Sequence, residues 1–188
     1  MNNISVFETN FLIFEPVSSG DVDFIYQLRS NRKDNFLKKI PKAKKIQIDY
    51  LNQYQQKFYN NEEIYYKIIE KKNLSKVGLV RITNLKDIER IGWESLIIKS
   101  ESEPTTGLDA CLSIYSLTFD ILKKKYLGPW IVTKENEKMM KIHHYMNIVD
   151  ILKENENNFI LEVKKEKYLR QKKAFNNVKL GIINSYYE

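Results

Sequence analysis

Short apolar runs alternate with amphipathic stretches from the N-terminus onward. The run FLIFEPV at 11–17 contains a proline near its end and is followed by the polar letters SSGD, which is typical of a short strand followed by a turn. The next residues show helical apolar spacing, and Ser19 or Asp21 is the expected cap of that helix. A second helix is predicted over 46–59, because its apolar residues recur every three or four positions.

Three strands are predicted next, over 63–72, 76–85 and 90–100. They are rich in Ile, Val, Tyr and Trp, and the short polar connections NLS and KDIE separate them. Connections of this length are typical of neighbouring antiparallel strands. We therefore expect the middle of the chain to form a meander.

The second half of the chain returns to alternating helices and strands. The expected order is a long helix at about 105–125, a buried strand at 127–133, a helix at 134–147, a strand pair at 149–155 and 158–165, and a last helix at 167–177. No internal repeat and no linker rich in Gly, Ser or Pro interrupts this order. The pattern indicates one domain that spans 1–188.

Composition is that of an ordinary globular protein. Hydrophobic residues make up 43% and charged residues 29% of the chain, which suits one sizeable core. No apolar run approaches the roughly 20 residues of a spanning helix, and no basic segment precedes the short apolar patch at the N-terminus. We therefore expect a cytoplasmic protein without membrane contact. The single cysteine, Cys111, excludes an internal disulfide and a Cys-rich metal site, and its helical apolar pattern predicts a core residue.

The charge balance is basic, with 31 Lys and Arg against 24 Asp and Glu. This balance favours anionic partners in general. The lysines occur in small groups along the chain rather than in one arm, so a nucleic acid is a less suitable partner than the phosphates of a small ligand.

The predicted order of elements resembles that of the GNAT superfamily of N-acetyltransferases. The most specific part is VTKENEKMMKIHHYMNIV, which is similar to the family's strand, asparagine and short terminated helix, and VGLVRITNL and IGWESLII add support. The resemblance covers about 11–165 and leaves 166–188 as a C-terminal extension. It implies an α/β (α+β) fold in which helices flank a mixed, mostly antiparallel sheet with a splayed fourth and fifth strand.

The resemblance also implies acetyl-coenzyme A as co-substrate, without a metal. The family holds the pyrophosphate on backbone N–H groups at a helix N-terminus, where the dipole also favours an anion. Here that turn is KSESEPTTG, in which Thr105, Thr106 and Gly107 are the expected donors. Pro104 and Asp109 depart from the family pattern at the positions of a Gln or Arg and of a small residue.

The strand before this turn is expected to pair with the pantetheine chain through the backbone of three apolar residues, Leu96, Ile97 and Ile98. The family places an asparagine at the start of the next helix of its coenzyme site, and Asn136 is the matching residue here. Seven residues on, His143 stands where the family commonly has a tyrosine that protonates the departing thiolate. The helix ends at Asn147 instead of the usual glycine, and asparagine tolerates the left-handed conformation that this position requires.

Glu94 is the candidate general base for the amine, with an exposed strand residue as the alternative interpretation. Trp93 is expected in the core, and the acceptor side is expected to include Asn31, Arg32, Asn35 and the second helix. The predicted reaction moves an acetyl group to a small-molecule primary amine, with an amino sugar on a nucleotide as one acceptor. A protein N-terminus, a polyamine, an antibiotic, a coenzyme-binding module without catalysis, and the oligomeric state all stay open.

Overall fold

The computed structural model describes residues 4–30, 44–176 and 182–187. Within them, nine strands form one sheet in the order β7-β8-β6-β5-β4-β3-β2-β1-β9. In chain order the strands are β1 Ile4–Thr9, β2 Leu12–Pro16, β3 Glu63–Glu70, β4 Ser75–Thr83, β5 Arg90–Ile98, β6 Tyr126–Thr133, β7 Val149–Glu154, β8 Asn158–Lys164 and β9 Ile182–Tyr187. The helices are α1 Val22–Ser30, α2 Lys44–Tyr59, α3 Thr106–Ser116, α4 Glu137–Met146 and α5 Lys165–Asn176, with a short 3₁₀ turn at Ser19–Asp21 and a π-helical turn at Leu117–Ile121.

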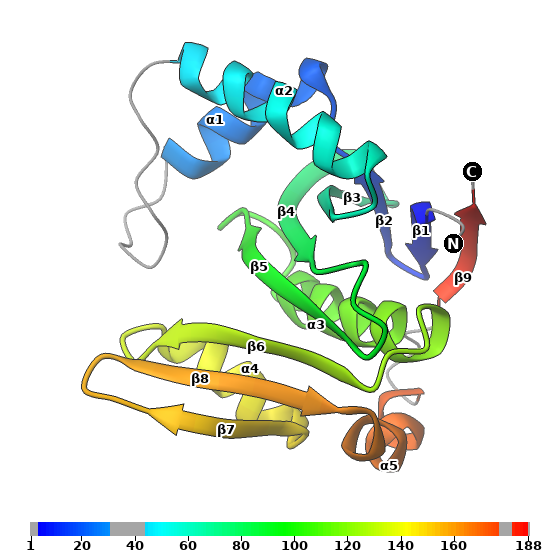
Figure 1. The fold of residues 1–188 in the computed structure, drawn as a ribbon, viewed down its shortest axis with the longest axis vertical. Coiled ribbons are helices and arrows are strands. Elements are labelled where there is room, and N and C mark those ends of the chain that lie inside the picture. The colour runs from blue at the N-terminus through cyan, green and yellow to red at the C-terminus, as the bar shows by residue number, and fades with distance from the viewer. Residues whose placement is uncertain (1–3, 31–43, 177–181, 188) are drawn as a thin grey trace.

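The predicted elements are confirmed in type and order, with boundaries that shift by a few residues. Two strands escaped the sequence analysis: β1 at the N-terminus and β9 near the C-terminus, which pair antiparallel with each other. The extension after 165 therefore contributes a helix and an edge strand to the same sheet. Figure 1 shows β9 beside β1.

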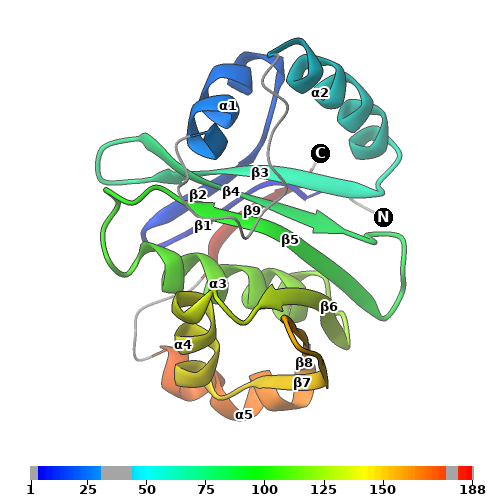
Figure 2. The same cartoon turned by 90° about the vertical axis from the view of Figure 1, so that its left-hand side faces the viewer.

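Helices cover both faces of the larger part of the sheet. α1 and α2 lie over one face of β2 to β5, and α3 lies over the other (Figure 2). The core divides accordingly. One buried cluster lies below α1 and α2 and includes Ile25, Leu51 and Leu79. The larger cluster lies between the sheet, α3 and α4, and Cys111 is buried in it as expected.

The two parts of the sheet meet at a very short junction. β1 to β5 are antiparallel neighbours, and β6, β8 and β7 form a second antiparallel group. β5 and β6 run parallel and share only the pairs Arg90 with Tyr126 and Ile91 with Leu127. Beyond these pairs the strands separate, which confirms the splay that the family resemblance implied (Figure 1).

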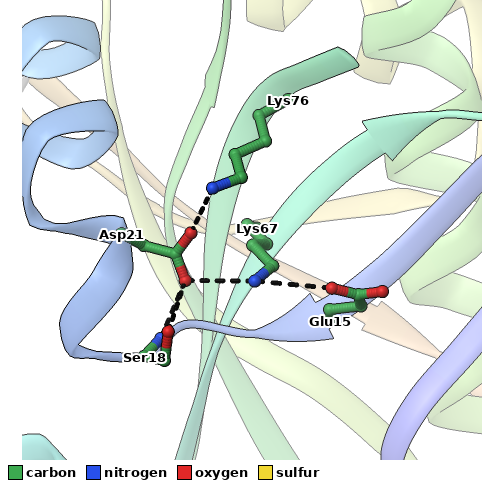
Figure 3. A network of polar contacts seen from close by, with 5 residues as sticks. All are labelled: Glu15, Ser18, Asp21, Lys67 and Lys76. Atoms are coloured by element: carbon green, nitrogen blue, oxygen red, sulfur yellow. Dashed lines mark hydrogen bonds and ion pairs between the residues drawn. The ribbon is translucent and has the colours of Figure 1, made fainter. Parts of the chain in front are cut away.

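A buried carboxylate fixes the start of α1 onto the sheet. Asp21 is 1% exposed and accepts hydrogen bonds from Lys76 Nζ at 2.6 Å and Lys67 Nζ at 3.1 Å. It also accepts from the N–H of Ser18 at 2.9 Å and from its hydroxyl at 3.1 Å (Figure 3). Ser18, rather than Ser19, is therefore the N-cap, and Asp21 completes the capping box.

The charge of Asp21 depends on these contacts. Burial alone would raise its pKa, but the hydrogen bonds from Lys76, Ser18 and Lys67 outweigh burial and lower the pKa from 3.8 to about 2. The carboxylate therefore ties α1 to β3 and β4 with its charge intact at neutral pH.

Replacing Asp21 with Asn is expected to lower the free energy of unfolding at pH 7 by roughly 2 kcal/mol, because the folded state loses an ionised acceptor of four hydrogen bonds. Since the pKa is lower in the folded than in the unfolded chain, this stabilisation is complete above the unfolded value of 3.8 and is lost as the pH falls through about 2. Urea unfolding at pH 7 and at low pH measures both effects. Asp23→Asn makes the same charge change at an exposed site of α1, two residues further on. An equal loss of stability in both variants would contradict the special role of Asp21.

Candidate functional site

The splay between β5 and β6 creates a wedge whose β5 side is a backbone edge. A β-bulge lies at this point: Arg81 of β4 pairs with Glu94, and Leu79 pairs with Ile97, so β5 has one residue more than β4 between the two pairs. Ser95 takes up this extra length with a φ of 55°. Because β6 follows β5 for only two residue pairs, the backbone after the bulge is available to a ligand.

The three residues predicted to bind pantetheine follow the bulge directly. Ile97 is 1% exposed and belongs to the cluster under α1 and α2, whereas Leu96 and Ile98 are half-buried against the larger cluster. Their side chains are thus occupied in the core, which leaves the backbone as the part that a ligand can reach. The binding role itself stays a prediction.

The turn after β5 leads into α3 as predicted, but the backbone N–H of Thr106, one of the three expected donors, is used within the turn. The N–H of Thr106 donates to Glu103 O at 2.9 Å, and its hydroxyl donates to Glu70 at 3.0 Å. Within the described chain no acceptor is found for the N–H groups of Gly107 and Leu108 in the first turn of α3. These two groups, next to the exposed cap Thr105, are the better donors for an anion.

Gly107 is not needed for an unusual backbone conformation. It lies inside α3, and Gly128 is the described glycine with a positive φ. A Cβ at Gly107 would meet Ile142 Cδ1 of α4 at 3.8 Å, an ordinary contact. The backbone conformation at Gly107 is therefore one that other residues can also adopt.

α4 begins and ends at the predicted residues. Asn136 is the N-cap, and its side-chain oxygen accepts from Met139 N–H at 3.3 Å. Asn147 has a φ of 50° and a ψ of 36°, and its N–H donates to the carbonyls of His143 and His144. The left-handed terminator is confirmed. The contact of Asn136 with a coenzyme stays a prediction, and its Oδ1 is already used by the helix.

Four aromatic side chains fill the inner part of the wedge. Trp93 of β5, Trp130 of β6, Tyr115 of α3 and His143 of α4 are each at most 7% exposed. The ring centroids of Trp93 and Trp130 are 5.1 Å apart, and His143 lies 5.9 Å from Trp93 and 5.4 Å from Trp130. Each of the four elements around the wedge thus contributes one ring to a single cluster, and Trp93 is in the core as predicted.

Three buried nitrogens in this cluster have no hydrogen-bond partner among the described residues: Trp93 Nε1, Trp130 Nε1 and His143 Nε2. Buried polar groups in folded proteins nearly always have a partner. An indole has one polar atom, so the side chain of each tryptophan forms no hydrogen bond within the described structure. Orphaned nitrogens from three elements thus lie together in one cluster at the wedge.

Burial sets the protonation of His143. It lowers the pKa of the ring to about 4, so the ring is neutral at pH 7. Tyr115 OH lies 3.3 Å from Nδ1, and burial raises the pKa of this hydroxyl well above its usual value. When the hydroxyl donates to Nδ1, the neutral ring carries its proton on Nε2. His143 then has one N–H with no acceptor in the described structure.

The side chain of Glu94 lies on the face of β5 that points away from the aromatic cluster. The register places Tyr65, Arg81 and Glu94 side by side across β3, β4 and β5. Arg81 forms an ion pair with Glu94 and donates to Tyr50 OH of α2 at 2.9 Å. The side chain of Glu94 is 49% exposed, one residue before the bulge.

The structure therefore does not bring Glu94 and His143 together. Glu94 lies on the face that α1 and α2 cover, and His143 lies on the side of α3 and α4, with the wedge between them.

Asn31, Arg32 and Asn35 lie outside the described residues. The sequence analysis did not single out Arg81, Tyr115 or Trp130. Of these, only Arg81 has a sequence signal, because it is the one charged residue within the apolar run VGLVRITNL. The described residues contain no helix able to span a membrane and no group of three side chains suited to a metal.

The ring of His143 is expected to titrate with a midpoint near pH 4 in the folded protein, because the buried ring resists protonation. Between the usual histidine value of 6.5 and about 4, the unfolded chain binds a proton that folded His143 does not, so this residue reduces stability as the pH falls through that range. NMR of the ring protons measures the midpoint. His144→Gln assigns the signal, since the chain has two histidines. A midpoint near 6.5 would show that the ring is open to water.

Comparison by sequence finds no matching family model and no matching curated protein. Comparison by structure finds the apo form of FdhC, a nucleotide-linked sugar GNAT, at a TM-score of 0.81 and 24% identity over 94% of this chain and 98% of that one. The spermidine N-acetyltransferase of Vibrio cholerae in complex with CoA and spermine matches at 0.67 and 18% over 84% and 98%. PseH, an N-acetyltransferase of Campylobacter jejuni, matches at 0.63 and 16% over 82% and 98%. The chain has the fold of the GNAT N-acetyltransferases.

Proposed function

We propose that the protein is an acyl-coenzyme A-dependent N-acetyltransferase that moves an acetyl group to a primary amine. The observation that carries the proposal is the wedge between β5 and β6, where a bulged backbone edge meets three buried nitrogens without partners. A thioester with a peptide-like arm has the acceptors and donors that such a place lacks. The GNAT fold of the chain supports the same activity.

The coenzyme would lie along the edge of β5. The amides of its pantetheine arm would pair with the backbone at Leu96, Ile97 and Ile98, as an added strand does. Its pyrophosphate would meet the N–H groups of Gly107 and Leu108, where the dipole of α3 favours an anion. Asn136, at the start of α4, would lie beside the arm on the other side of the wedge.

The reaction forms a bond between the amine nitrogen and the acetyl carbon and breaks the bond from that carbon to sulfur. Glu94 would take the proton that the amine loses, because it is the exposed carboxylate beside the bulge. Backbone N–H groups of β5 would stabilise the oxygen that becomes negative. The thiolate finally takes up a proton.

His143 fits the role of a hydrogen-bond donor better than that of a general acid. With a pKa of about 4, its imidazolium form would be present in about one molecule in a thousand at pH 7. Its neutral Nε2–H can still donate to the thioester oxygen or to the leaving sulfur. The proton for the thiolate would then come from solvent or from the amine through Glu94.

The side chains around Glu94 favour one chemical class of amine acceptor. Arg81, Tyr50 and Glu94 form a polar row at the surface on the α1 and α2 side, which suits an acceptor with hydroxyl or phosphate groups beside its amine. An amino sugar linked to a nucleotide is such an acceptor, and the structural neighbour FdhC is a nucleotide-linked sugar GNAT. A screen for thiol release with sugar-nucleotide amines, polyamines and peptide amines separates the acceptor classes. Coenzyme binding without turnover on any of them would favour a binding module.

Acetyl-coenzyme A is expected to change the tryptophan fluorescence of the protein, because both tryptophans of the chain, Trp93 and Trp130, lie in the wedge. Gly107→Val is expected to fold normally, since its Cβ finds room in α3, and to weaken binding by about tenfold or more by obstructing the pyrophosphate. Thr105→Ala is the control, because the exposed Thr105 side chain makes no capping hydrogen bond. Unchanged affinity of a folded Gly107→Val variant would place the pyrophosphate elsewhere.

Glu94→Gln is expected to lower the rate of acetylation by roughly a hundredfold or more, as removal of a general base does, while the affinity for acetyl-coenzyme A stays the same. Steady-state rates and the fluorescence titration together test this pair of outcomes. Glu89→Gln is the matched control, an exposed carboxylate that pairs with Lys125. A similar loss of rate in both variants would remove Glu94 from the mechanism.

A further inference from the structure

A separate cleft lies behind the first turn of α3. It has a volume of about 360 Å³ and lies between the β1–β2 turn, the end of β3 and the start of α3, with Phe11, Glu70, Thr106 and Asp109 in its lining. Gly107, on the same turn of α3, faces Ile142 of α4. Since β2 and β3 are far from β6 in the strand order, the cleft and the wedge lie on different sides of α3.

Two carboxylates in this cleft lack a counter-charge. Lys71 pairs with Glu8 at 2.6 Å and Lys72 pairs with Glu103 at 3.5 Å, so each lysine of the cleft has a carboxylate other than Glu70 and Asp109 as its partner. Glu70 accepts a hydrogen bond from the hydroxyl of Thr106, but no cation pairs with it in the described structure. The second carboxylate is that of Asp109.

Asp109 is the stronger sign of a ligand. The residue is 7% exposed, and within the described residues its carboxylate forms neither a hydrogen bond nor an ion pair. Burial raises its pKa to about 6, so at neutral pH it is still mostly charged. A buried carboxylate without a partner is unfavourable, and a cation in the cleft would relieve this cost.

The chemistry of the lining selects the kind of cation. The described residues hold no group of three side chains suited to a metal ion, and the two carboxylates would repel an anion. The ring of Phe11 is 47% exposed at the cleft, next to the buried Leu12, and offers an apolar surface and a π face. An ammonium group on a short alkyl chain satisfies both the charge and the apolar part.

We propose that this cleft binds a protonated alkylamine through Asp109 and Glu70. The site is separate from the wedge and from the acceptor side, and it does not rest on the proposed acetyltransferase activity. Because Thr106 and Asp109 belong to the first turn of α3, a bound amine would contact the same turn whose other side carries the free N–H of Gly107.

The test is an NMR titration of the full chain with 1,4-diaminobutane at neutral pH. We expect saturable shifts at the resonances of Phe11, Thr106 and Asp109, and no saturable shifts with the neutral 1-butanol. Asp109→Asn is expected to weaken binding by about tenfold or more, since a charged hydrogen bond is lost. Glu70→Gln is a second variant with a smaller expected loss, should Asp109→Asn fail to fold.

Two further variants show whether the amine binds in this cleft or elsewhere on the protein. Asp49→Asn makes the same charge change at an exposed position of α2, across the sheet from the cleft, and is expected to leave binding unchanged. Glu137→Gln removes an exposed carboxylate at the start of α4 and is also expected to leave binding unchanged. Loss of affinity in either control equal to that in Asp109→Asn, equal binding of 1-butanol, or no saturable shifts at the cleft would overturn the proposal.

Discussion

The short junction between β5 and β6 is the constraint on which the rest of the molecule depends. Two residue pairs hold the two parts of the sheet in register, and the bulge at Ser95 then bends β5 away from its parallel neighbour. Backbone N–H and C=O groups that face the gap have no strand to pair with. In a folded protein such groups need a partner, which water or a ligand that enters the wedge can supply. The aromatic cluster at its inner end closes the wedge and prevents the two parts from packing into one continuous sheet.

Much of this architecture can be predicted from local pattern, because helix and strand periodicities depend on neighbours along the chain. Asn147 shows how far this reaches: an asparagine at the end of an amphipathic stretch predicts a left-handed terminator, and the backbone adopts it. β1 and β9 were not predicted, because each forms by pairing with a segment that is distant in the sequence. Residues 4–9 and 182–187 pair across almost the whole length of the chain, and no local pattern contains that information.

The candidate site likewise contains residues that a local motif predicts and residues that only tertiary packing brings in. His143 can be found by counting from Asn136 along one helix, since both belong to one local motif. Tyr115 and Trp130 cannot be found so, because they come from α3 and β6 and meet His143 only through tertiary packing. Arg81 meets Glu94 through the register of β4 with β5, and the bulge determines that register. Thr106 was predicted as a backbone donor, but its N–H is used within the turn that positions Gly107 and Leu108.

Unpaired buried groups provide a common physical reason for assigning ligands to both sides of α3. An orphaned buried donor or acceptor is unfavourable by about 1–3 kcal/mol, and the described residues contain others besides those in the wedge. Two of the others have further polar atoms that are satisfied: the second oxygen of Glu63 binds Lys57, and the guanidinium of Arg81 binds Glu94 and Tyr50. The orphaned nitrogens of Trp93, Trp130 and His143 differ from the others because their rings lie together in one cluster. Asp109 is 7% exposed, and its carboxylate forms no hydrogen bond or ion pair within the described structure. A fold of marginal stability retains such costs most readily where a bound molecule offsets them, and these residues lie on the two sides of one helix turn.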